Sequence, residues 1–542
     1  MRLRLLMSLL PAAAVMLTQQ SCTKKNAPAA ATAVKTDTTK TLRNAEDPGE
    51  FLIIKAINLG SKKALEIGGY NLQDNAMAKQ NTFLNNAPAS NNNYQKWKVR
   101  NVGSGYYTVM NLGSGKYLEG MNANQQVIQK RAAITDKQLW SIEAVTGGYK
   151  IINKANGLVL SVAQSDLNGS PVGLAAYQNS PYQQWSMQIL PVDSYRDDAV
   201  VGFFQRTSGS TAFDGGSSVP LSTGQVLWLT NDAFYNQINS TGNFNCNTIF
   251  PYRNTALVQP ASKSWDPAQT VNITSPYGNE IFRTTDNKNL LWPGAGIQVG
   301  SKVYVHNIEV PRNNLNTVNQ YLSEMRSNGT TSIPQVINHS IPGMTGQTDI
   351  IYSIGMVKPG DGYVYVYGAG GFIGAGVYVA RFAESAPLTW TFWNGSTWAT
   401  TPTTASAARV YSGSVNNNTV GFVKGKFVIV DMSFGFTCDV EPRDMYTSIS
   451  TSPTGPFTNK RKVYTLPDIK QGHKPVFYNP TIHAEFDNGD NELLVNYCVN
   501  FYSKNDGTGA TCLTDCSNAD GSKDPNDYRP KGVRIPYSLI GL

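Results

Sequence analysis

The chain repeats the pattern Gln-x-Trp three times, as Gln95-Lys96-Trp97, Gln138-Leu139-Trp140 and Gln183-Gln184-Trp185. Successive copies are 43 and 45 residues apart. An even repeat of this length, with one large aromatic residue in each copy, is typical of a structure assembled from three similar units. Residues 51–191, which contain the repeats, are therefore predicted to form one threefold domain.

The surroundings of each motif indicate what one unit contains. A short β-rich run opens the unit, an Asn and a Gly-containing turn follow, and a Leu-rich second run precedes a polar loop that leads to Gln-x-Trp. The opening runs are 52–54, 107–109 and 149–152, and the Asn residues are Asn58, Asn111 and Asn153. Three units of about four short strands each make a β-trefoil.

Residues 51–191 resemble the ricin-B-type lectin family, and the three Gln-x-Trp motifs carry the resemblance. It implies that Trp97, Trp140 and Trp185 pack in a shared core, where their large buried area stabilises the fold. The tryptophans are thus expected to report architecture and not sugar contact.

The same resemblance implies sugar-binding positions. A pocket of this family needs an acidic residue soon after the second strand begins and an aromatic platform for one face of the sugar. Glu66 and Glu119 occupy acidic positions, where Asp is usual, and Phe83 and Tyr177 are the candidate platforms. Two interpretations stay open, a carbohydrate-binding domain and a structural spacer. The remaining acidic position and the remaining platform position depart from the pattern and hold Ser161 and Arg131.

A different repeat fills residues 195–542. A β-rich run, a Gly-containing turn and a second β-rich run recur five times, which is a strong hairpin signal. Five similar hairpins predict a five-bladed β-propeller in which each hairpin supplies the inner strands of one blade. The runs Val200–Phe204 and Gly532–Ile535 are predicted to close the ring, and the whole chain is predicted to be all-β. The five turns are at Gly224, Gly300, Gly360-Asp361, Gly425 and Gly489-Asp490.

Residues just before or early in each hairpin should point toward one central funnel. Acids, a Trp, an Arg and a His on a common funnel make a polar pocket with an aromatic wall, which suits a glycan. The positions concerned hold Asp214, Trp292, Asp349, Arg409 and the His483–Glu485 pair.

Residues 199–540 resemble glycosidase-like five-bladed propeller families of bacterial proteins, several of them described as domains of unknown function. Relatives of this type include arabinan-cleaving glycoside hydrolases, and the resemblance implies Asp214 and Asp232 as a catalytic pair. Many relatives have Gly-Asp-Thr where this chain has Asn231-Asp232-Ala233. The segments that carry the resemblance are Phe213–Leu221, Leu227–Asp232, Trp292–Gly296, His483–Phe486 and Tyr528–Pro530.

The chemistry of glycoside cleavage fits this pair independently of the resemblance. One carboxylic acid protonates the leaving oxygen, and a second carboxylate activates water or attacks carbon. Asp214 and Asp232 lie at the two ends of one predicted hairpin, which are on the same side, so both carboxylates can face one pocket. Glu485 is a candidate third acid, and Trp292 and His483 are candidate sugar-binding residues.

Each of these residues also has a structural interpretation that stays open. Asp214 precedes Gly215 and would shape a turn. Asp232 would hydrogen-bond the loop backbone, and Glu485 would pair with an Arg. His483 would be a hydrogen-bonded structural residue, and Trp292 would belong to the core.

The N-terminus predicts export. Arg2 and Arg4 precede a short apolar stretch, Leu5–Leu17, which is too short to span a membrane. Ser21-Cys22 follows, so residues 1–21 resemble a bacterial lipoprotein signal in which Cys22 becomes lipidated, although Gln19 and Gln20 depart from the strict motif. An ordinary cleaved signal with an incidental Cys is the alternative. Residues 22–50 are predicted to be a flexible tether.

Composition limits the partners. A net charge of +8 over 542 residues, without long basic runs, argues against a nucleic-acid partner. We expect a monomer without a cofactor; a propeller channel can hold calcium on Asp and Asn oxygens, but no ligand string here requires it. Without paired Cys motifs or clustered His residues, no metal site is expected.

The leading interpretation is an exported, lipid-anchored glycoside hydrolase of a bacterial outer membrane, facing the periplasm or the outside. Its substrate would be a polysaccharide, with an arabinan-type furanoside implied by the resemblance, and the trefoil would be its carbohydrate-binding module. The alternative is a non-catalytic glycan-binding surface lipoprotein.

Overall fold

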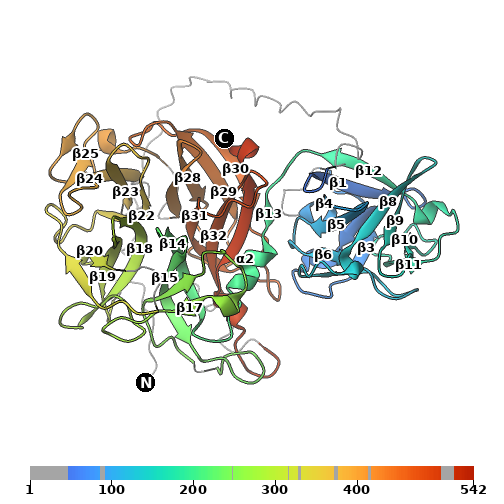
Figure 1. Ribbon diagram of the computed structural model, residues 1–542, viewed down its shortest axis with the longest axis horizontal. Coiled ribbons are helices and arrows are strands. Elements are labelled where there is room, and N and C mark those ends of the chain that lie inside the picture. The colour runs from blue at the N-terminus through green and yellow to red at the C-terminus, as the bar shows by residue number, and fades with distance from the viewer. Residues whose placement is uncertain are drawn as a thin grey trace, which may run out of the picture.

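The computed structural model describes residues 47–85, 92–246, 248–314, 316–326, 331–370, 376–412, 417–501 and 518–542. The predicted lipidation site, Cys22, lies outside these residues. The described chain is all-β and forms two domains next to each other, joined between Leu190 and Tyr195 (Figure 1). No helix within the described ranges is both long enough and apolar enough to cross a membrane.

The N-terminal domain is a β-trefoil. Six of its strands close into a ring by antiparallel pairing in the order β1-β4-β5-β8-β9-β12, and β12 pairs back onto β1. The other six form three hairpins that belong to the three repeats. The ring strands are β1 (Phe51–Asn58), β4 (Trp97–Gly103), β5 (Tyr106–Asn111), β8 (Trp140–Val145), β9 (Gly148–Asn153) and β12 (Trp185–Leu190). The hairpin strands are β2 (Ala64–Ile67), β3 (Ala78–Asn81), β6 (Tyr117–Glu119), β7 (Ile128–Lys130), β10 (Val159–Val162) and β11 (Val172–Ala175).

The three tryptophans of the repeat form the centre of this domain. Each has no exposed surface, and each donates its indole N–H to a backbone carbonyl of its own repeat at 3.1 Å. A buried indole N–H needs such an acceptor. The predicted core role of these residues is confirmed, and the acceptors are Leu65, Leu118 and Leu160.

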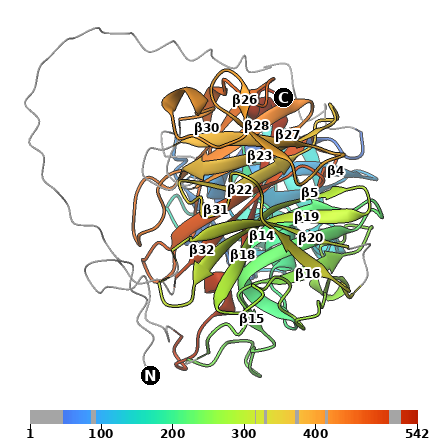
Figure 2. The same cartoon turned by 90° about the vertical axis from the view of Figure 1, so that its left-hand side faces the viewer.

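The C-terminal domain has five antiparallel sheets arranged around a centre, with the first long strand of each sheet innermost (Figures 1 and 2). The predicted five-bladed propeller and the inner position of the five hairpins are confirmed. The blades in chain order are β14 (Ser210–Pro220), β15 (Val226–Tyr235), β16 (Thr255–Gln259) and β17 (Val271–Asn272); β18 (Asn289–Val299), β19 (Lys302–Pro311), β20 (Asn319–Met325) and β21 (Val336–His339); β22 (Ile350–Val357), β23 (Tyr363–Gly370), β24 (Val377–Ala383), β25 (Trp390–Trp393) and β26 (Trp398–Ala399); β27 (Asn418–Val423), β28 (Lys426–Met432), β29 (Asp444–Ser450) and β30 (Thr458–Thr465); and β31 (Val476–His483), β32 (Glu492–Asn500), β33 (Lys531–Pro536) and β13 (Tyr195–Arg196).

The ring closes differently from the prediction. The expected closing strand Val200–Phe204 is part of a short helix, α2 (Asp198–Phe203). Its N-cap is Asp197, whose carboxylate accepts the backbone N–H groups of Ala199 and Val200, so the capping residue turns the chain into a helix. The strand that pairs with β33 is the earlier β13, and the predicted late strand within Gly532–Ile535 is present.

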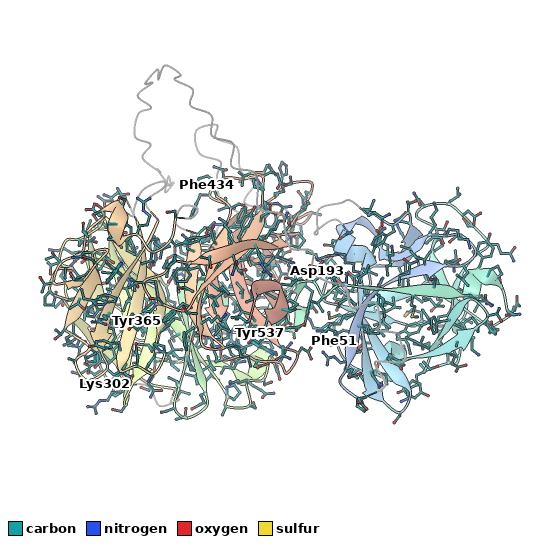
Figure 3. All side chains as sticks on the ribbon, turned by 90° about the horizontal axis from the view of Figure 1, so that it is seen from above. Phe51, Asp193, Lys302, Tyr365, Phe434 and Tyr537 are labelled. Atoms are coloured by element: carbon teal, nitrogen blue, oxygen red, sulfur yellow. The ribbon has the colours of Figure 1, made fainter. Side chains whose placement is uncertain are left out.

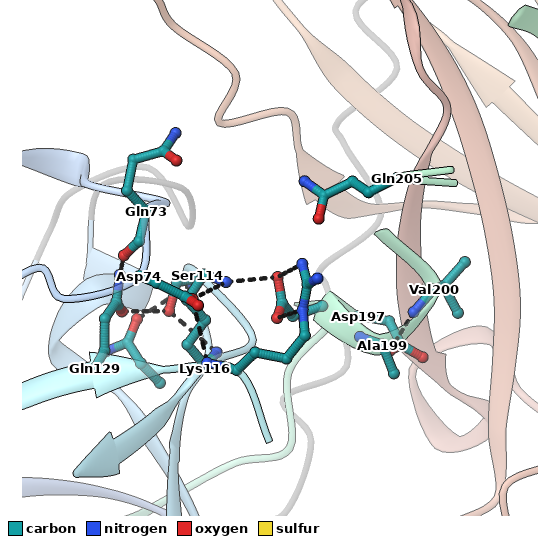
Figure 4. A network of polar contacts seen from close by, with 12 residues as sticks. Gln73, Asp74, Ser114, Lys116, Gln129, Asp197, Ala199, Val200 and Gln205 are labelled. Atoms are coloured by element: carbon teal, nitrogen blue, oxygen red, sulfur yellow. Dashed lines mark hydrogen bonds and ion pairs between the residues drawn. The ribbon is translucent and has the colours of Figure 1, made fainter. Parts of the chain in front are cut away.

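Ion pairs join the two domains. Asp198 of α2 forms ion pairs with two trefoil residues, with Lys116 Nζ at 3.0 Å and Arg131 Nε at 2.8 Å (Figure 4). Lys116 also pairs with Asp74 of the trefoil. Buried Lys98 bonds Asp490 and Glu492 of the propeller at 3.0 and 2.9 Å. Because these charges are largely buried, losing one partner leaves the other unpaired and costly, which favours one relative placement of the domains.

Candidate active site

A bulge in the first blade brings the two predicted acids together. β14 and β15 pair regularly from Ser217 to Pro220, but their register shifts between Phe213, which pairs with Ala233, and Gly215, which pairs with Thr230. Asp214 and Asp232 both lie in this irregular stretch, where the charge of Asp214 acts on Asp232. Gly215 and Gly216 in the bulge have φ values of 82° and 89°, a region that strongly favours glycine. A bulge of this kind re-aims side chains, and here it turns both carboxylates into one site.

Asp232 is held by two donors from different segments. Its Oδ1 accepts the indole N–H of Trp292 on β18 at 3.0 Å. Its Oδ2 accepts a bond from Arg253, just before β16, at 2.9 Å. Trp292 is therefore tied to the acid through its indole N–H, and its sugar-binding role stays a prediction.

Asp214 is held by two tyrosines that the sequence prediction missed. The hydroxyl of Tyr478 on β31 donates to Asp214 Oδ2 at 2.9 Å. Tyr528, in the short 3-10 helix η8 (Pro525–Tyr528), hydrogen-bonds the same carboxylate. In the sequence, Tyr528-Arg529-Pro530 indicates only a resemblance to other propeller proteins. No motif around Tyr478 indicates a site residue, because only its position on the fifth inner strand brings it to Asp214.

The surroundings raise the pKa of both acids. Burial raises the pKa of Asp214 to about 6, against the lowering effect of the Tyr528 and Tyr478 hydrogen bonds. Burial, followed by the charge of Asp214, raises the pKa of Asp232 to about 7, although Arg253 and Trp292 lower it. Two close carboxylates in a poorly solvated site cannot both ionise readily, so near neutral pH the pair shares one proton.

The site around the pair is partly open, although the Asp214 Oδ1 atom itself is buried. Asp214, Trp292 and Tyr478 are each partly exposed although protein surrounds them, whereas Asp232 retains only 9% of its surface. Surrounded yet reachable groups are what a pocket for a small polar ligand provides.

His483 and Glu485 do not join this pair. Their partner is Ser218, whose hydroxyl lies 2.6 Å from His483 Nδ1 and donates to Glu485 Oε1. Ser218 follows Asp214 by four residues on β14, which is at most about 13 Å along a strand that rises about 3.3 Å per residue. The structure thus places His483 and Glu485 beside Ser218, further along the inner strand than Asp214. Asp349 immediately precedes β22, whereas Arg409 follows the short 3-10 helix η7 (Ser406–Ala408).

His483, Glu485 and Ser218 are better explained as a group of hydrogen bonds that joins the first blade to the last. Burial lowers the pKa of His483 to about 3, so its ring is neutral, and the ring lies 4.9 Å from that of Trp228. Burial raises the pKa of Glu485. Its carboxylate bonds Ser218, and Lys263 donates to its backbone carbonyl at 2.6 Å.

In the trefoil, the first repeat contains a cavity of about 280 Å³ lined by Glu66. The Glu66 carboxylate accepts Asn81 Nδ2 at 2.7 Å and Gln95 Nε2 at 2.6 Å. Amide and carboxylate groups at the edge of an open cavity are suitable partners for sugar hydroxyls. Phe83, the predicted platform, is partly exposed and lies 4.3 Å from the Lys55 ammonium.

The other two repeats differ. Glu119 is 7% exposed and accepts Gln138 Nε2 at 3.0 Å, and Arg131 at the platform position is bonded to Asp198 of the propeller. In the third repeat, the Tyr177 hydroxyl donates to Asn179 and accepts from Gln184. The first repeat is the best candidate sugar site because its acid, Glu66, lines an open cavity, whereas Glu119 is buried.

Disulfide chemistry occurs only in the propeller part of the described chain. Cys246 and Cys438 are each disulfide-bonded, while Cys498 is a buried free thiol whose Sγ lies 3.3 Å from the Gly215 carbonyl. Among the residues that the structure describes, no group of three His, Cys, Asp or Glu side chains is placed to hold a metal ion.

Comparison with known proteins supports this division of the chain. Residues 197–537 match the family described as Domain of unknown function (DUF5005), and residues 93–175 match the Ricin-type beta-trefoil lectin domain-like family. No curated protein matches the sequence.

Several solved structures are similar in part. A presumed hydrolase from Bacteroides ovatus ATCC 8483 shares 19% identity, covering 63% of this chain and 90% of its own, with a TM-score of 0.49. The Rhizoctonia solani agglutinin shares 19% identity, and the match covers 27% of this chain and 97% of the agglutinin, with a TM-score of 0.23. The Macrolepiota procera ricin B-like lectin, solved with lactose, shares 18% identity, covering 26% and 96%, with a TM-score of 0.22.

Proposed function

We propose that this chain, which belongs to the DUF5005 family and carries a ricin-type trefoil lectin-like domain, is a glycoside hydrolase that acts on a polysaccharide. The observation that carries the proposal is the pair Asp214 and Asp232, which lie in the same bulged stretch of β14 and β15 and whose pKa values are raised to about 6 and about 7. Pairs of carboxyl groups whose surroundings push their pKa values apart divide acid and base roles between them.

In this proposal Asp232 is the proton donor. It keeps its proton to higher pH than Asp214, and proton delivery to the leaving glycosidic oxygen is the step that needs a protonated acid near neutral pH. Asp214 is the ionised partner, held in place by Tyr478 and Tyr528. It either activates water or attacks the anomeric carbon.

The trefoil serves as a carbohydrate-binding module in the same proposal. The lectin-like family match and the open Glu66 cavity support this role. A binding module joined to a catalytic one raises the local concentration of polymer near the active site without a new contact inside it. The ion-paired junction at Asp198 would keep the two sites at a fixed separation.

A non-catalytic glycan-binding protein is the second candidate. The observation in its favour is that both oxygens of Asp232 already have donors, Trp292 and Arg253. An acid that must transfer a proton needs one oxygen turned toward the substrate. In the hydrolase proposal, substrate binding displaces or shares one of these bonds.

A glycan screen separates the two candidates. Plant and microbial furanose and pyranose polysaccharides, arabinan among them, are incubated with the wild-type protein, Asp214→Asn, Asp232→Asn and the exposed control Asp286→Asn. We expect sugar release by the wild type and the control, and a loss of about 10²- to 10⁴-fold in both site variants. Binding without release from every glycan would reject the hydrolase and leave the binding protein.

The location is a further part of the proposal. The Arg2–Leu17 stretch followed by Cys22 supports export and lipid anchoring in a bacterial outer membrane. Fractionation of cells that express the full chain tests the anchor. Cys22→Ser should move the protein from the membrane to the soluble fraction, and a variant that stays with the membrane would contradict lipidation at this residue.

A further inference from the structure

Phe434 is an aromatic side chain with 42% of its surface exposed, in the segment that follows β28. In Figure 3 it lies on the opposite side of the propeller from Lys302, the first residue after a hairpin turn. Because β28 runs antiparallel to the inner strand β27, its end lies where the inner strands begin. Phe434 therefore lies on the face from which Asp214, early in its own inner strand, is approached.

Phe434 is the outer member of a continuous aromatic row. Its ring centroid is 5.7 Å from that of Phe436, and Phe436 stacks on Tyr478 at 6.2 Å with an interplanar angle of 29°. Tyr478 in turn donates its hydroxyl to Asp214 at 2.9 Å. The aromatic row, defined as Phe434, Phe436 and Tyr478, thus leads from the exposed surface to the carboxylate pair.

The backbone holds this row in place. The Gly435 carbonyl accepts the backbone N–H of Phe477 at 2.9 Å, and a Cβ at Gly435 would lie 2.1 Å from the Phe477 carbonyl. Asn417 Nδ2 donates to the Ser433 carbonyl at 3.1 Å, and Cys438 is disulfide-bonded. A side chain kept exposed by a fixed backbone is pre-organised for a ligand, because binding then requires little further ordering.

The chemistry of the row selects its ligand. Its outer two members are phenyl rings without hydrogen-bonding groups, and they lie next to a site of carboxylates and hydroxyls. Sugar rings have an apolar C–H face and polar edges, so the C–H face can lie on the phenyl rings while the hydroxyls stay in water. An extended chain of sugars fits a row of rings better than a single sugar does.

We propose that the aromatic row is an accessory subsite that binds a further sugar unit of a chain whose cleaved unit lies at Asp214 and Asp232. The inference rests on the proposed function and makes its substrate class more specific: an oligosaccharide or polysaccharide chain, in preference to a single sugar on a small leaving group.

The test compares a chain with a small substrate. The kcat/KM values of wild type and Phe434→Ala are measured on the polysaccharide most readily cleaved in the screen and on a nitrophenyl glycoside of the same sugar. We expect Phe434→Ala to lower kcat/KM on the chain by about three- to tenfold, mainly through KM, and much less on the nitrophenyl glycoside. An equal loss on both substrates, or no loss on the chain, would overturn the subsite.

Two controls keep failure of the subsite apart from failure of the proposed function. Leu388→Ala removes a side chain of similar exposure, 38%, from another blade and should leave kcat/KM unchanged on both substrates. Equal midpoints of thermal unfolding show that the variants fold. If no glycan is cleaved, binding to the same polysaccharides is measured in a Glu66→Gln background. Weaker polysaccharide binding by Phe434→Ala would support the subsite while rejecting hydrolysis. Unchanged binding would reject the subsite as well.

Discussion

Trp292 donates its indole N–H to Asp232 at 3.0 Å across the boundary between the first and second blades. One inner strand thus supplies the acid's neighbour Asp214, and the next supplies a donor that lowers the pKa of Asp232. The acidity of Asp232 is therefore set jointly by two blades, and a substitution in the second blade should alter the pH dependence of a reaction centred on the first.

Trp292→Phe should move one limb of the pH profile. Activity requires ionised Asp214 and protonated Asp232, so kcat/KM should rise as the pH passes about 6 and fall as it passes about 7. Loss of the indole bond removes an influence that lowers the pKa of Asp232, so the alkaline limb should shift to higher pH. Because Asp232 is protonated at the optimum, the lost bond joins two uncharged groups and contributes about 0.5–1.5 kcal/mol, which corresponds to about a two- to tenfold loss.

The measurement is the pH dependence of kcat/KM on the best polysaccharide of the screen. Trp398→Phe is the matched control, because Trp398 lies on β26 in another blade and packs against Trp393. An alkaline limb that stays in place, or moves to lower pH, would show that Asp232 is not the group titrated.

The raised pKa of Asp232 should also appear in stability. An Asp in an unfolded chain titrates near about 3.9, so between that pH and about 7 the folded state binds more protons than the unfolded state. Stability contributed by this group is thus fully present below the unfolded pKa and is lost as the pH rises through the folded one. The slope from this group approaches about 1.4 kcal/mol per pH unit.

Asp232→Asn should therefore flatten the fall in stability between pH 5 and pH 7. Calorimetric unfolding at several pH values measures this, and the slope is the readout because the variant also loses its Arg253 pair at every pH. Asp286→Asn, at an exposed turn, should leave the slope unchanged. Parallel curves for Asp232→Asn and wild type would mean that Asp232 is ionised throughout this range.

The architecture could be predicted because it repeats. Three Gln-x-Trp motifs and five hairpin turns each report the same local structure several times, so errors at one copy matter little. The prediction of a closing strand at Val200–Phe204 is wrong for the opposite reason, because that segment does not repeat. A single residue, the N-cap Asp197, makes Val200–Phe203 helical.

The site could be predicted only where it is local in sequence. Asp214 and Asp232 belong to one hairpin, so their meeting follows from its turn. Tyr478 reaches Asp214 across 264 positions of sequence, and no periodicity in either segment indicates that contact. His483 ends β31 and Glu485 follows it, and their contact with Ser218 depends on how far along the inner strand each residue lies, which the hairpin pattern does not indicate.

Glycan binding by the trefoil should depend on one repeat. Glu66→Gln removes the charge that holds Asn81 and Gln95 at the edge of the 280 Å³ cavity, so binding of the best polysaccharide of the screen should fall about tenfold or more. Glu119→Gln is the matched control, because Glu119 is buried against Gln138 and should leave affinity unchanged. Titration calorimetry in an Asp232→Asn, Phe434→Ala background isolates the trefoil. Equal losses in both Glu variants would contradict a single-repeat site.

Asp198→Asn should loosen the junction between the domains. Burial opposes ionisation of Asp198, but the hydrogen bond from Arg131 and the charge of Lys116 outweigh it and hold the pKa of Asp198 below its usual value. Removing the charge leaves Arg131 without its carboxylate partner and Lys116 paired only with the more exposed Asp74, and a hydrogen bond to a charged group contributes about 1.5–3 kcal/mol. The trefoil should then unfold in its own calorimetric transition at lower temperature, and proteases should cut between Leu190 and Tyr195 more readily.

Asp193→Asn is the control, because it breaks the pair with Lys96 beside the same segment and should change neither the unfolding transition nor the cleavage. A single transition that is unchanged by Asp198→Asn would mean that contacts other than these ion pairs couple the domains.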